Sequence, residues 1–251
     1  MVSAYFAPAR PRVLAHRGLA VDAPENTLLA FARAVAIGCA FIETDVHLSH
    51  DGTAVVAHDP TLERVAGRQV EVAKLTMAEL RRVDLGHGQG FCSLAEALDA
   101  FPETRFNIDV KVEEAVAPTI EAIAGVHAEA RVLLTSFSER RRRRLAALVP
   151  GAVTSVGAAG VIRARLASLT GSTRVLSHAL RGARALQVPE RAGPLRLVTE
   201  RFVAAAHRAG AEVHVWTVNE ESDMTRLLDL GVDGLVTDRA DVALSLIADR
   251  N

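Results

Sequence analysis

The chain has 251 residues, 49% of them hydrophobic and 24% charged, so a large buried core is expected and a disordered chain is not. A formal net charge of -1 gives no reason to expect binding to nucleic acid or to an anionic membrane. No apolar run is long enough to span a membrane, and Met1 to Arg12 lacks the apolar core of a secretory signal. These features favour a cytoplasmic protein with no nucleic-acid partner.

Eight short, apolar segments rich in β-forming residues recur along the chain, separated by longer amphipathic segments. Strands alternating with helices of this length predict parallel βαβ units, and eight units predict a closed barrel. We therefore expect an α/β fold, a single (β/α)8 TIM barrel over residues 1–251, with an open doubly wound sheet as the alternative. The predicted strands are Arg12–Ala15, Ala40–His47, Arg105–Val110, Arg131–Thr135, Ala152–Val156, Arg184–Val188, Glu212–Thr217 and Gly234–Thr237.

The first predicted helix, Thr27–Ile37, begins with a residue that commonly caps helix N-termini and ends before Gly38, a residue common at helix C-termini. A run of five arginines, Arg140–Arg144, falls in another helical segment. We expect this run to be a solvated helix face, with an anion or partner site as the alternative. The remaining predicted helices of this kind are Glu113–Val126, Ser138–Leu148, Val161–Leu169, Thr199–Arg208 and Glu220–Leu230.

The alternation of strands and helices is interrupted after the second predicted strand. Asp51-Gly52 is a good hairpin turn, and the segment from about residue 59 to 90 is rich in glycine, charge and short apolar runs. We interpret this segment as a small insertion on top of the barrel, with one short helix at Met77–Val83. A barrel helix at Leu94–Ala100 is expected to follow it.

Polar residues cluster where the predicted strands end. In a barrel of parallel strands these ends converge on one mouth, which is where barrel enzymes place their chemistry. One such cluster means little, but six on the same face indicate a functional site. The clusters are His16-Arg17-Gly18, Glu43 with Asp45, His58-Asp59, Asp109 with Lys111, Trp216 to Asn219, and Thr237-Asp238-Arg239.

Three carboxylates within these clusters suggest a metal site. Glu43 and Asp45 are two residues apart on a strand and so face the same side, and Asp109 can add a third carboxylate from the neighbouring strand. Acids placed this close repel one another unless a positive charge lies between them. Three carboxylates without cysteine favour Mg²⁺ or Ca²⁺ over Zn²⁺. The alternative is a salt-bridged rim of the barrel.

Two histidines in the clusters, His16 and His58, each follow an apolar segment and precede a charged residue. Imidazole can give and take protons near neutral pH, so the pair would suit one base and one acid. Arg17 and Lys111 are cations on the same expected mouth and could bind phosphate oxygens. The alternatives are that the histidines are structural and that the two cations only neutralise the acids.

Taken together, these motifs resemble the glycerophosphodiester phosphodiesterase family, in its short bacterial form. His16-Arg17-Gly18, Pro24 to Thr27, Glu43 to Val46, Asp51-Gly52 and His58-Asp59 match the family's N-terminal motifs in order and spacing. Asn107 to Lys111, Trp216 to Asn219 and Gly231 to Asp238 match later strands, so the resemblance covers nearly the whole chain. It implies a (β/α)8 barrel that hydrolyses glycerophosphodiesters to an alcohol and glycerol 3-phosphate.

The resemblance also implies roles for individual residues. Glu43, Asp45 and Asp109 would bind a divalent metal (Mg²⁺ or Ca²⁺, with Mn²⁺ a further candidate). His16 and His58 would be the acid/base pair, with Arg17 and Lys111 as phosphate ligands. Glu25 and Asn26 would organise the first loop on the substrate side. Trp216 would line a glycerol pocket, with core packing as the alternative reading of the chain's single tryptophan.

One departure concerns Asp109, because the family usually has Glu at this position. Asp is shorter by one methylene, roughly 1.5 Å of reach, so metal preference or affinity is expected to differ. The expected partner is a small glycerophosphodiester, and the oligomeric state is not fixed. The alternatives are a lysophospholipase D-like lipid phosphodiesterase, a non-catalytic barrel that binds a phosphate ligand, and an unrelated aldolase- or enolase-type barrel.

Overall fold

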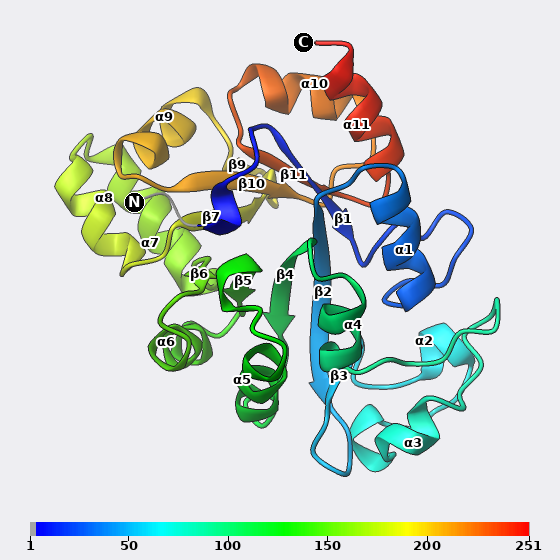
Figure 1. The fold of residues 1–251 in the computed structure, drawn as a ribbon. Coiled ribbons are helices and arrows are strands. Elements are labelled where there is room, and N and C mark those ends of the chain that lie inside the picture. The colour runs from blue at the N-terminus through cyan, green and yellow to red at the C-terminus, as the bar shows by residue number, and fades with distance from the viewer. Residues whose placement is uncertain (1–3, 251) are drawn as a thin grey trace.

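The computed structural model describes residues 4–250, whose strands form a ring surrounded by helices (Figure 1). The eight parallel strands are β1 (Arg12–His16), β2 (Phe41–Leu48), β4 (Arg105–Val110), β5 (Val132–Thr135), β6 (Val153–Thr154), β7 (Ala185–Pro189), β10 (Glu212–Trp216) and β11 (Gly234–Thr237). Their order around the ring is β6-β5-β4-β2-β1-β11-β10-β7. The expected (β/α)8 barrel is confirmed.

The ring closes between its two end strands, β6 and β7, through a short contact. A single parallel bridge joins Ser155 to Ala185, and Arg184 N donates to Thr154 O at 2.9 Å. The Ser155 hydroxyl also accepts a hydrogen bond from Gln187 N at 3.1 Å. Because these contacts close the ring, the open-sheet alternative is wrong. β6 has only two residues and is shorter than the strand predicted at Ala152–Val156.

Helices cover the outside of the ring, so the strands are buried on both faces. Two of the helices were not predicted: α8 is short and follows α7 almost directly, and α11 lies beyond the last motif. The helices are α1 (Leu28–Ala36), α4 (Leu94–Ala100), α5 (Val116–Gly125), α6 (Glu139–Leu148), α7 (Ala158–Leu169), α8 (Thr173–Leu180), α9 (Glu200–Arg208), α10 (Glu221–Asp229) and α11 (Ala240–Ala248).

Local sequence explains where the first helix starts and stops. The side chain of Thr27 accepts a hydrogen bond from Ala30 N at 3.3 Å and caps α1, as predicted. Gly38 follows the helix with a φ of +86°, a conformation that favours glycine. The face of α1 that includes Ala30 and Phe31 is fully buried. The helix therefore fixes the loop between β1 and α1, which carries several of the expected site residues.

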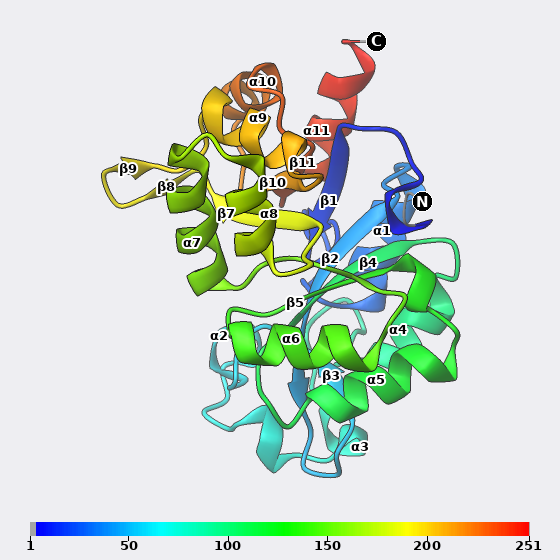
Figure 2. The same cartoon turned by 90° about the vertical axis from the view of Figure 1, so that its left-hand side faces the viewer.

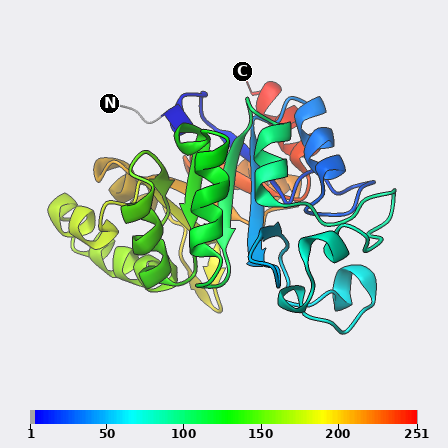
Figure 3. The ribbon, with the colours of Figure 1, turned by 60° about the horizontal axis from the view of Figure 1, so that its bottom comes forward.

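The predicted insertion follows β2 and lies to one side of the barrel (Figures 1 and 3). β3 (Ala54–Val56) leads into the insertion, which contains α2 (Glu63–Ala66), the 3-10 helix η2 (Val72–Lys74) and α3 (Met77–Leu80), shorter than the helix predicted at Met77–Val83. The insertion has a small core of its own: Val55, Ala57, Leu62, Val72, Met77, Leu80, Val83 and Phe91. That residues 1–251 form a single domain stays a prediction.

Two smaller features mark opposite ends of the barrel. The 3-10 helix η1 (Ala4–Phe6) covers the N-terminal ends of the strands, where Tyr5 packs edge-on against Phe41. A short hairpin, β8 (Arg191–Ala192) and β9 (Leu195–Arg196), follows β7 and projects from the body of the molecule (Figure 2). None of the helices within residues 4–250 has the length and apolar character needed to cross a membrane.

Candidate active site

Strand register brings the expected site residues to one mouth. His16 lies beside Glu43 across the β1–β2 pair, and Asp45 lies beside Asp109 across the β2–β4 pair. His58 reaches the same level because β3 runs back antiparallel along β2, and Ala57 N donates to the carbonyl of Asp45 at 3.0 Å. The hairpin turn predicted at Asp51-Gly52 therefore returns the second histidine to the carboxylates.

Lys111 lies between two of the three predicted metal ligands. Its Nζ is 2.7 Å from Asp45 Oδ1 and 2.7 Å from Asp109 Oδ2. Arg17 Nε is 3.3 Å from the other oxygen of Asp45. Burial disfavours the charged form of Lys111, but Asp45 and Asp109 outweigh it and raise the Lys111 pKa. As the structure stands, the two cations neutralise these acids, which is the alternative considered from the sequence.

Glu43 differs from the other two acids because no lysine or arginine within residues 4–250 forms an ion pair with it. Its nearest cationic partner is His16, whose Nε2 is 3.9 Å from Oε2. Burial and then the neighbouring charge of Asp45 raise the Glu43 pKa to about 8. Burial also raises the pKa of Asp109, despite Lys111 beside it. The mouth therefore holds more buried carboxyl groups than its own cations keep ionised.

Unpaired oxygens show where a cation would fit. Glu43 Oε2, Asp109 Oδ1 and Asn107 Oδ1 are buried and accept no hydrogen bond. Buried acceptors without a donor are costly, and hard divalent ions prefer oxygen ligands of this kind. Residues 4–250 nevertheless contain no ready-made group of three histidine, cysteine or carboxylate side chains able to hold a metal. The oxygen donors are of the kind that binds a divalent ion. In this structure, however, one oxygen of Asp45 and one oxygen of Asp109 are paired with Lys111.

Both histidines form a pair with a carboxylate. His16 Nδ1 is 2.7 Å from Asp238 Oδ1, and His58 Nδ1 is 2.7 Å from Asp59 Oδ1. An ionised carboxylate can only accept, so Nδ1 donates in each pair and Nε2 is left for other chemistry. Burial lowers the His16 pKa, but Asp238 and Glu43 outweigh it, so the pKa of His16 is raised.

The first loop is fastened to β2 through Asn26. Its side-chain amide donates to Asp45 Oδ2 at 3.2 Å, and its carbonyl accepts from the Thr44 hydroxyl at 2.8 Å. Asn26 and Arg17 both have positive φ, 55° and 57°, which only a well-determined loop maintains in residues other than glycine. A Cβ on Gly18 would lie 2.7 Å from the backbone of Ala30, so this position requires glycine.

Trp216 lies at the C-terminal end of β10, partly exposed, and packs on the apolar interior of the barrel. Its ring also meets Phe137 edge-on, with 6.0 Å between ring centroids, and Lys111 Nζ is 5.7 Å from the Phe137 ring centre. The two aromatic side chains therefore form a wall of the mouth. Core packing is therefore part of the role of Trp216, while its place beside a glycerol group stays a prediction. Phe137 was not predicted as a site residue.

Several residues that hydrogen-bond to the two histidines or to their partners were not predicted from the sequence. Asp238 lies in a recognised cluster but had no role, and Asn219 Nδ2 donates to its second oxygen at 2.7 Å. His47, which no predicted cluster included, is buried and donates from Nε2 to the His58 carbonyl at 3.1 Å. No local pattern shows these contacts, because each joins segments that are separate in sequence.

The arginine run requires a correction. The expected solvated face is wrong for Arg142, which is only 1% exposed and pairs with Glu139 at 2.8 Å. It is also wrong for Arg141, whose Nη1 donates to Val110 O at the end of β4 at 2.9 Å. The five residues cover more than one full turn of α6, so part of the run must face the barrel.

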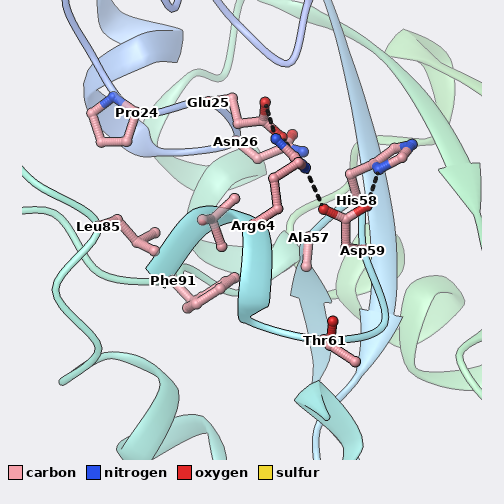
Figure 4. A pocket seen from close by; sticks show the side chains of 11 residues that line it. Pro24, Glu25, Asn26, Ala57, His58, Asp59, Thr61, Arg64, Leu85 and Phe91 are labelled. Carbon is pink, nitrogen blue, oxygen red and sulfur yellow. Dashed lines mark hydrogen bonds and ion pairs between the residues drawn. The ribbon is translucent and has the colours of Figure 1, made fainter. Parts of the chain in front are cut away.

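A cavity of about 190 Å³ lies beside His58, between the first loop and the insertion (Figure 4). Glu25, Asp59 and Arg64 line it together with apolar side chains, including Pro24 and Phe91. The ion pairs that join the polar members are drawn in Figure 4. The insertion therefore lines one side of the cavity beside His58.

The mouth combines two carboxylate-paired histidines, an arginine, a lysine and buried acids. These are the groups expected of a barrel hydrolase that acts on phosphate esters. A sequence model of the glycerophosphoryl diester phosphodiesterase family matches residues 16–242. The chain belongs to this family, which makes it a phosphodiesterase, as expected from its motifs.

Similar proteins agree with this assignment. The chain is 39% identical over 239 residues to the probable glycerophosphodiester phosphodiesterase 2 of Mycobacterium tuberculosis, covering 94% of this chain and 90% of that protein. A putative glycerophosphoryl diester phosphodiesterase from Silicibacter pomeroyi is 26% identical, with a TM-score of 0.83 and coverage of 99% and 96%. A phosphodiesterase from Oleispira antarctica, in complex with the product sn-glycerol-3-phosphate, is 26% identical, with a TM-score of 0.77 and coverage of 95% and 97%.

Proposed function

We propose that this mouth hydrolyses glycerophosphodiesters to an alcohol and glycerol 3-phosphate, with His16 and His58 as the acid/base pair. The observation that carries the proposal is the matched pairing of both histidines through Nδ1 with a carboxylate. Each pairing fixes a tautomer and leaves Nε2 for proton transfer. The glycerol 3-phosphate bound by the relative from Oleispira antarctica supports the same product here.

The residues assigned to phosphate are Arg17 and Lys111. Arginine can hold two phosphate oxygens at once, and lysine offers a point charge. Both now pair with carboxylates, so a substrate phosphate would compete for them with Asp45 and Asp109. Glu25 and Asn26 support Arg17 from the first loop. Trp216 is assigned to the glycerol side of the site.

Glu43, Asp45 and Asp109 would hold a divalent ion, Mg²⁺ or Ca²⁺, with Mn²⁺ a further candidate. When bound, such an ion withdraws charge from the phosphoryl oxygens and supports the transition state. The unpaired oxygens of Glu43 and Asp109 support this assignment. The location expected from the sequence, the cytoplasm, likewise stays a proposal.

In the proposed reaction one histidine removes the proton of the attacking oxygen as the new P–O bond forms. The other histidine protonates the leaving alkoxide as its P–O bond breaks. The glycerol 2-hydroxyl is the proposed first nucleophile, which gives a cyclic phosphate that water then opens. Rapid-quench sampling tests this route: it predicts a transient cyclic phosphate. Absence of the cyclic species, together with failure to hydrolyse it when added, would contradict the route.

The test of the proposed function is release of glycerol 3-phosphate from glycerophosphocholine and glycerophosphoethanolamine, with Mg²⁺, Ca²⁺, Mn²⁺ or EDTA. We expect metal-dependent release that His16→Ala abolishes. A folded protein that releases nothing with any ion would contradict the proposal and favour a lysophospholipid substrate or a phosphate-binding role. Assay with a lysophospholipid and binding of inorganic phosphate would then separate those two alternatives.

A further inference from the structure

Arg64, a charged side chain of the insertion, takes part in the ion pairs beside the mouth (Figure 4). Arg64 lies on α2, and its guanidinium contacts two carboxylates at once. Its Nη1 and Nη2 bind both oxygens of Glu25, at 2.9 and 2.6 Å. Its Nε binds Asp59 Oδ2 at 2.5 Å. This geometry uses the planar fork of arginine, which lysine cannot reproduce.

Each of these carboxylates has a second partner that we assign to the reaction. The other oxygen of Asp59 is 2.7 Å from Nδ1 of His58. Glu25 Oε1 also accepts from Arg17 Nη1 at 3.0 Å. A continuous chain of contacts therefore runs from His58 through Asp59, Arg64 and Glu25 to Arg17, joining the acid/base group to the phosphate group.

The charges in this chain depend on Arg64. Burial disfavours the charged form of Glu25, but Arg64 and then Arg17 outweigh it and lower the Glu25 pKa. The Asp59 pKa is also lowered, because the hydrogen bonds of His58 and Arg64 outweigh burial. Without Arg64, two carboxylates would face the same cavity with only Arg17 and His58 to balance them.

The insertion holds Arg64 in place through its own packing. Leu62, two residues earlier, is fully buried in the small core of the insertion, and Gly67 ends α2 in the left-handed conformation. Leu62 N also bonds to Val70 O at 2.9 Å, so both sides of α2 are fixed. The segment therefore presents Arg64 from a defined backbone position rather than from a free loop.

We infer that Arg64 is a positioning residue: by bridging Glu25 and Asp59, it fixes His58 and Arg17 relative to each other. The inference rests on the proposed function through the roles given to His58 and Arg17. It assigns the insertion a part in the reaction, because α2 supplies the link between the two halves of the site.

The chain offers a matched control in Arg81. Arg81 belongs to the same insertion, is 49% exposed like Arg64, and binds Glu96 through Nε and Nη2 at 3.2 and 2.9 Å. That partner, Glu96, lies on α4 and has no assigned role in the reaction. Arg64→Gln and Arg81→Gln therefore each remove an equally exposed arginine that forms ion pairs. They differ in the partners: Glu25 and Asp59 for Arg64, and Glu96 for Arg81.

We expect Arg64→Gln to lower kcat by roughly 10- to 100-fold, because displacement by about 1 Å can cost that much. Arg81→Gln should stay within about twofold of the wild type. Arg64→Lys should recover only part of the loss, since one ammonium cannot bind both carboxylates in the same geometry. Combining Arg64→Gln with Asp59→Asn should cost less than the product of the separate losses, because the two residues act in one chain. Equal kcat and KM in Arg64→Gln and Arg81→Gln would overturn the inference.

A readout independent of hydrolysis keeps the two proposals separate. The ring-proton NMR signals of His58, assigned with His58→Ala, should shift in Arg64→Gln and Arg64→Lys and not in Arg81→Gln. If the wild type released no glycerol 3-phosphate with any ion, the proposed function would fail, while the His58 signals would still decide the role of Arg64. Unchanged His58 signals in a folded Arg64→Gln variant would overturn the positioning role.

Discussion

The two ends of the barrel pair their inward glutamates, Glu212 and Glu43, in opposite ways. At the N-terminal end of the strands, both oxygens of Glu212 accept from Arg12 at 2.8 Å, and His214 adds a third contact at 3.0 Å. At the C-terminal mouth, Glu43 has only His16 at 3.9 Å and one oxygen without a hydrogen bond. Burial raises the pKa of both carboxyls, but its partners lower the Glu212 pKa to about 2, whereas Asp45 helps to raise the Glu43 pKa to about 8.

This contrast separates Glu212, whose ion pair stabilises the fold, from Glu43, which we assign to the proposed metal site. At the N-terminal end Arg12 binds both oxygens of Glu212 and also lies over the rings of Phe6 and Phe41. At the mouth, buried acids remain under-paired, which costs stability but suits a phosphate–metal site. Barrel enzymes generally place catalysis at this end and stability at the other.

The largest expected effect is on activity at the mouth. His16→Ala and His58→Ala should each lower kcat by roughly 10²- to 10⁴-fold, because each removes a group that transfers a proton. Steady-state release of glycerol 3-phosphate measures the loss, and circular dichroism checks folding. His178→Ala, on the outer helix α8, is the control and should retain activity. A His58→Ala enzyme with unchanged kcat would remove that residue from the proposed pair.

At the N-terminal end the expected effect is on stability. Arg12→Met should lower the free energy of unfolding by roughly 2–4 kcal/mol, because it leaves the half-buried Glu212 without its main partner. Urea unfolding measures the change. The folded fraction should keep a wild-type kcat, since Arg12 lies away from the mouth. A loss below about 1 kcal/mol would show that the pair behaves like an exposed salt bridge.

The pH dependence follows from the lowered Glu212 pKa. A carboxyl that titrates near 2 when folded and near 4.5 when unfolded binds fewer protons in the native state. Its contribution, on the order of 3 kcal/mol, is therefore present above about pH 4.5 and lost as the pH falls toward 2. Unfolding curves of the wild type and Glu212→Gln should converge at acid pH. Parallel curves over that range would contradict the assignment.

A smaller effect is expected from restoring the longer acid at the mouth. Asp109→Glu should lower the concentration of activating ion needed for half-maximal activity by roughly tenfold, because the carboxylate gains reach toward Glu43. Titration of activity with Mg²⁺ and Ca²⁺ measures the change. Glu139→Asp, an acid that pairs with Arg142, is the control for general effects of acid length. An unchanged ion requirement would indicate that Asp109 serves Lys111 alone.

The sequence predicted the barrel and the place of its mouth because apolar strands followed by polar residues form a local pattern. Register then brought His16 to Glu43 and Asp45 to Asp109 without further information. Contacts between distant segments could not be predicted this way: Asp238 is 222 residues from His16 in sequence. The position of Lys111 between two predicted metal ligands depends on side-chain geometry, which spacing does not determine.

The most direct test of the contrast is thermal unfolding of the wild type and Glu43→Gln, each with EDTA and with Mg²⁺. Without metal at pH 7, Glu43→Gln should be more stable than the wild type by roughly 1–2 kcal/mol, because Glu43, with a pKa raised to about 8, must take up a proton on folding and glutamine need not. Magnesium should raise the Tm of the wild type and leave that of Glu43→Gln nearly unchanged. A variant less stable than the wild type in EDTA, or an equal Mg²⁺ response in both proteins, would contradict the claim that Glu43 is kept under-paired for a cation.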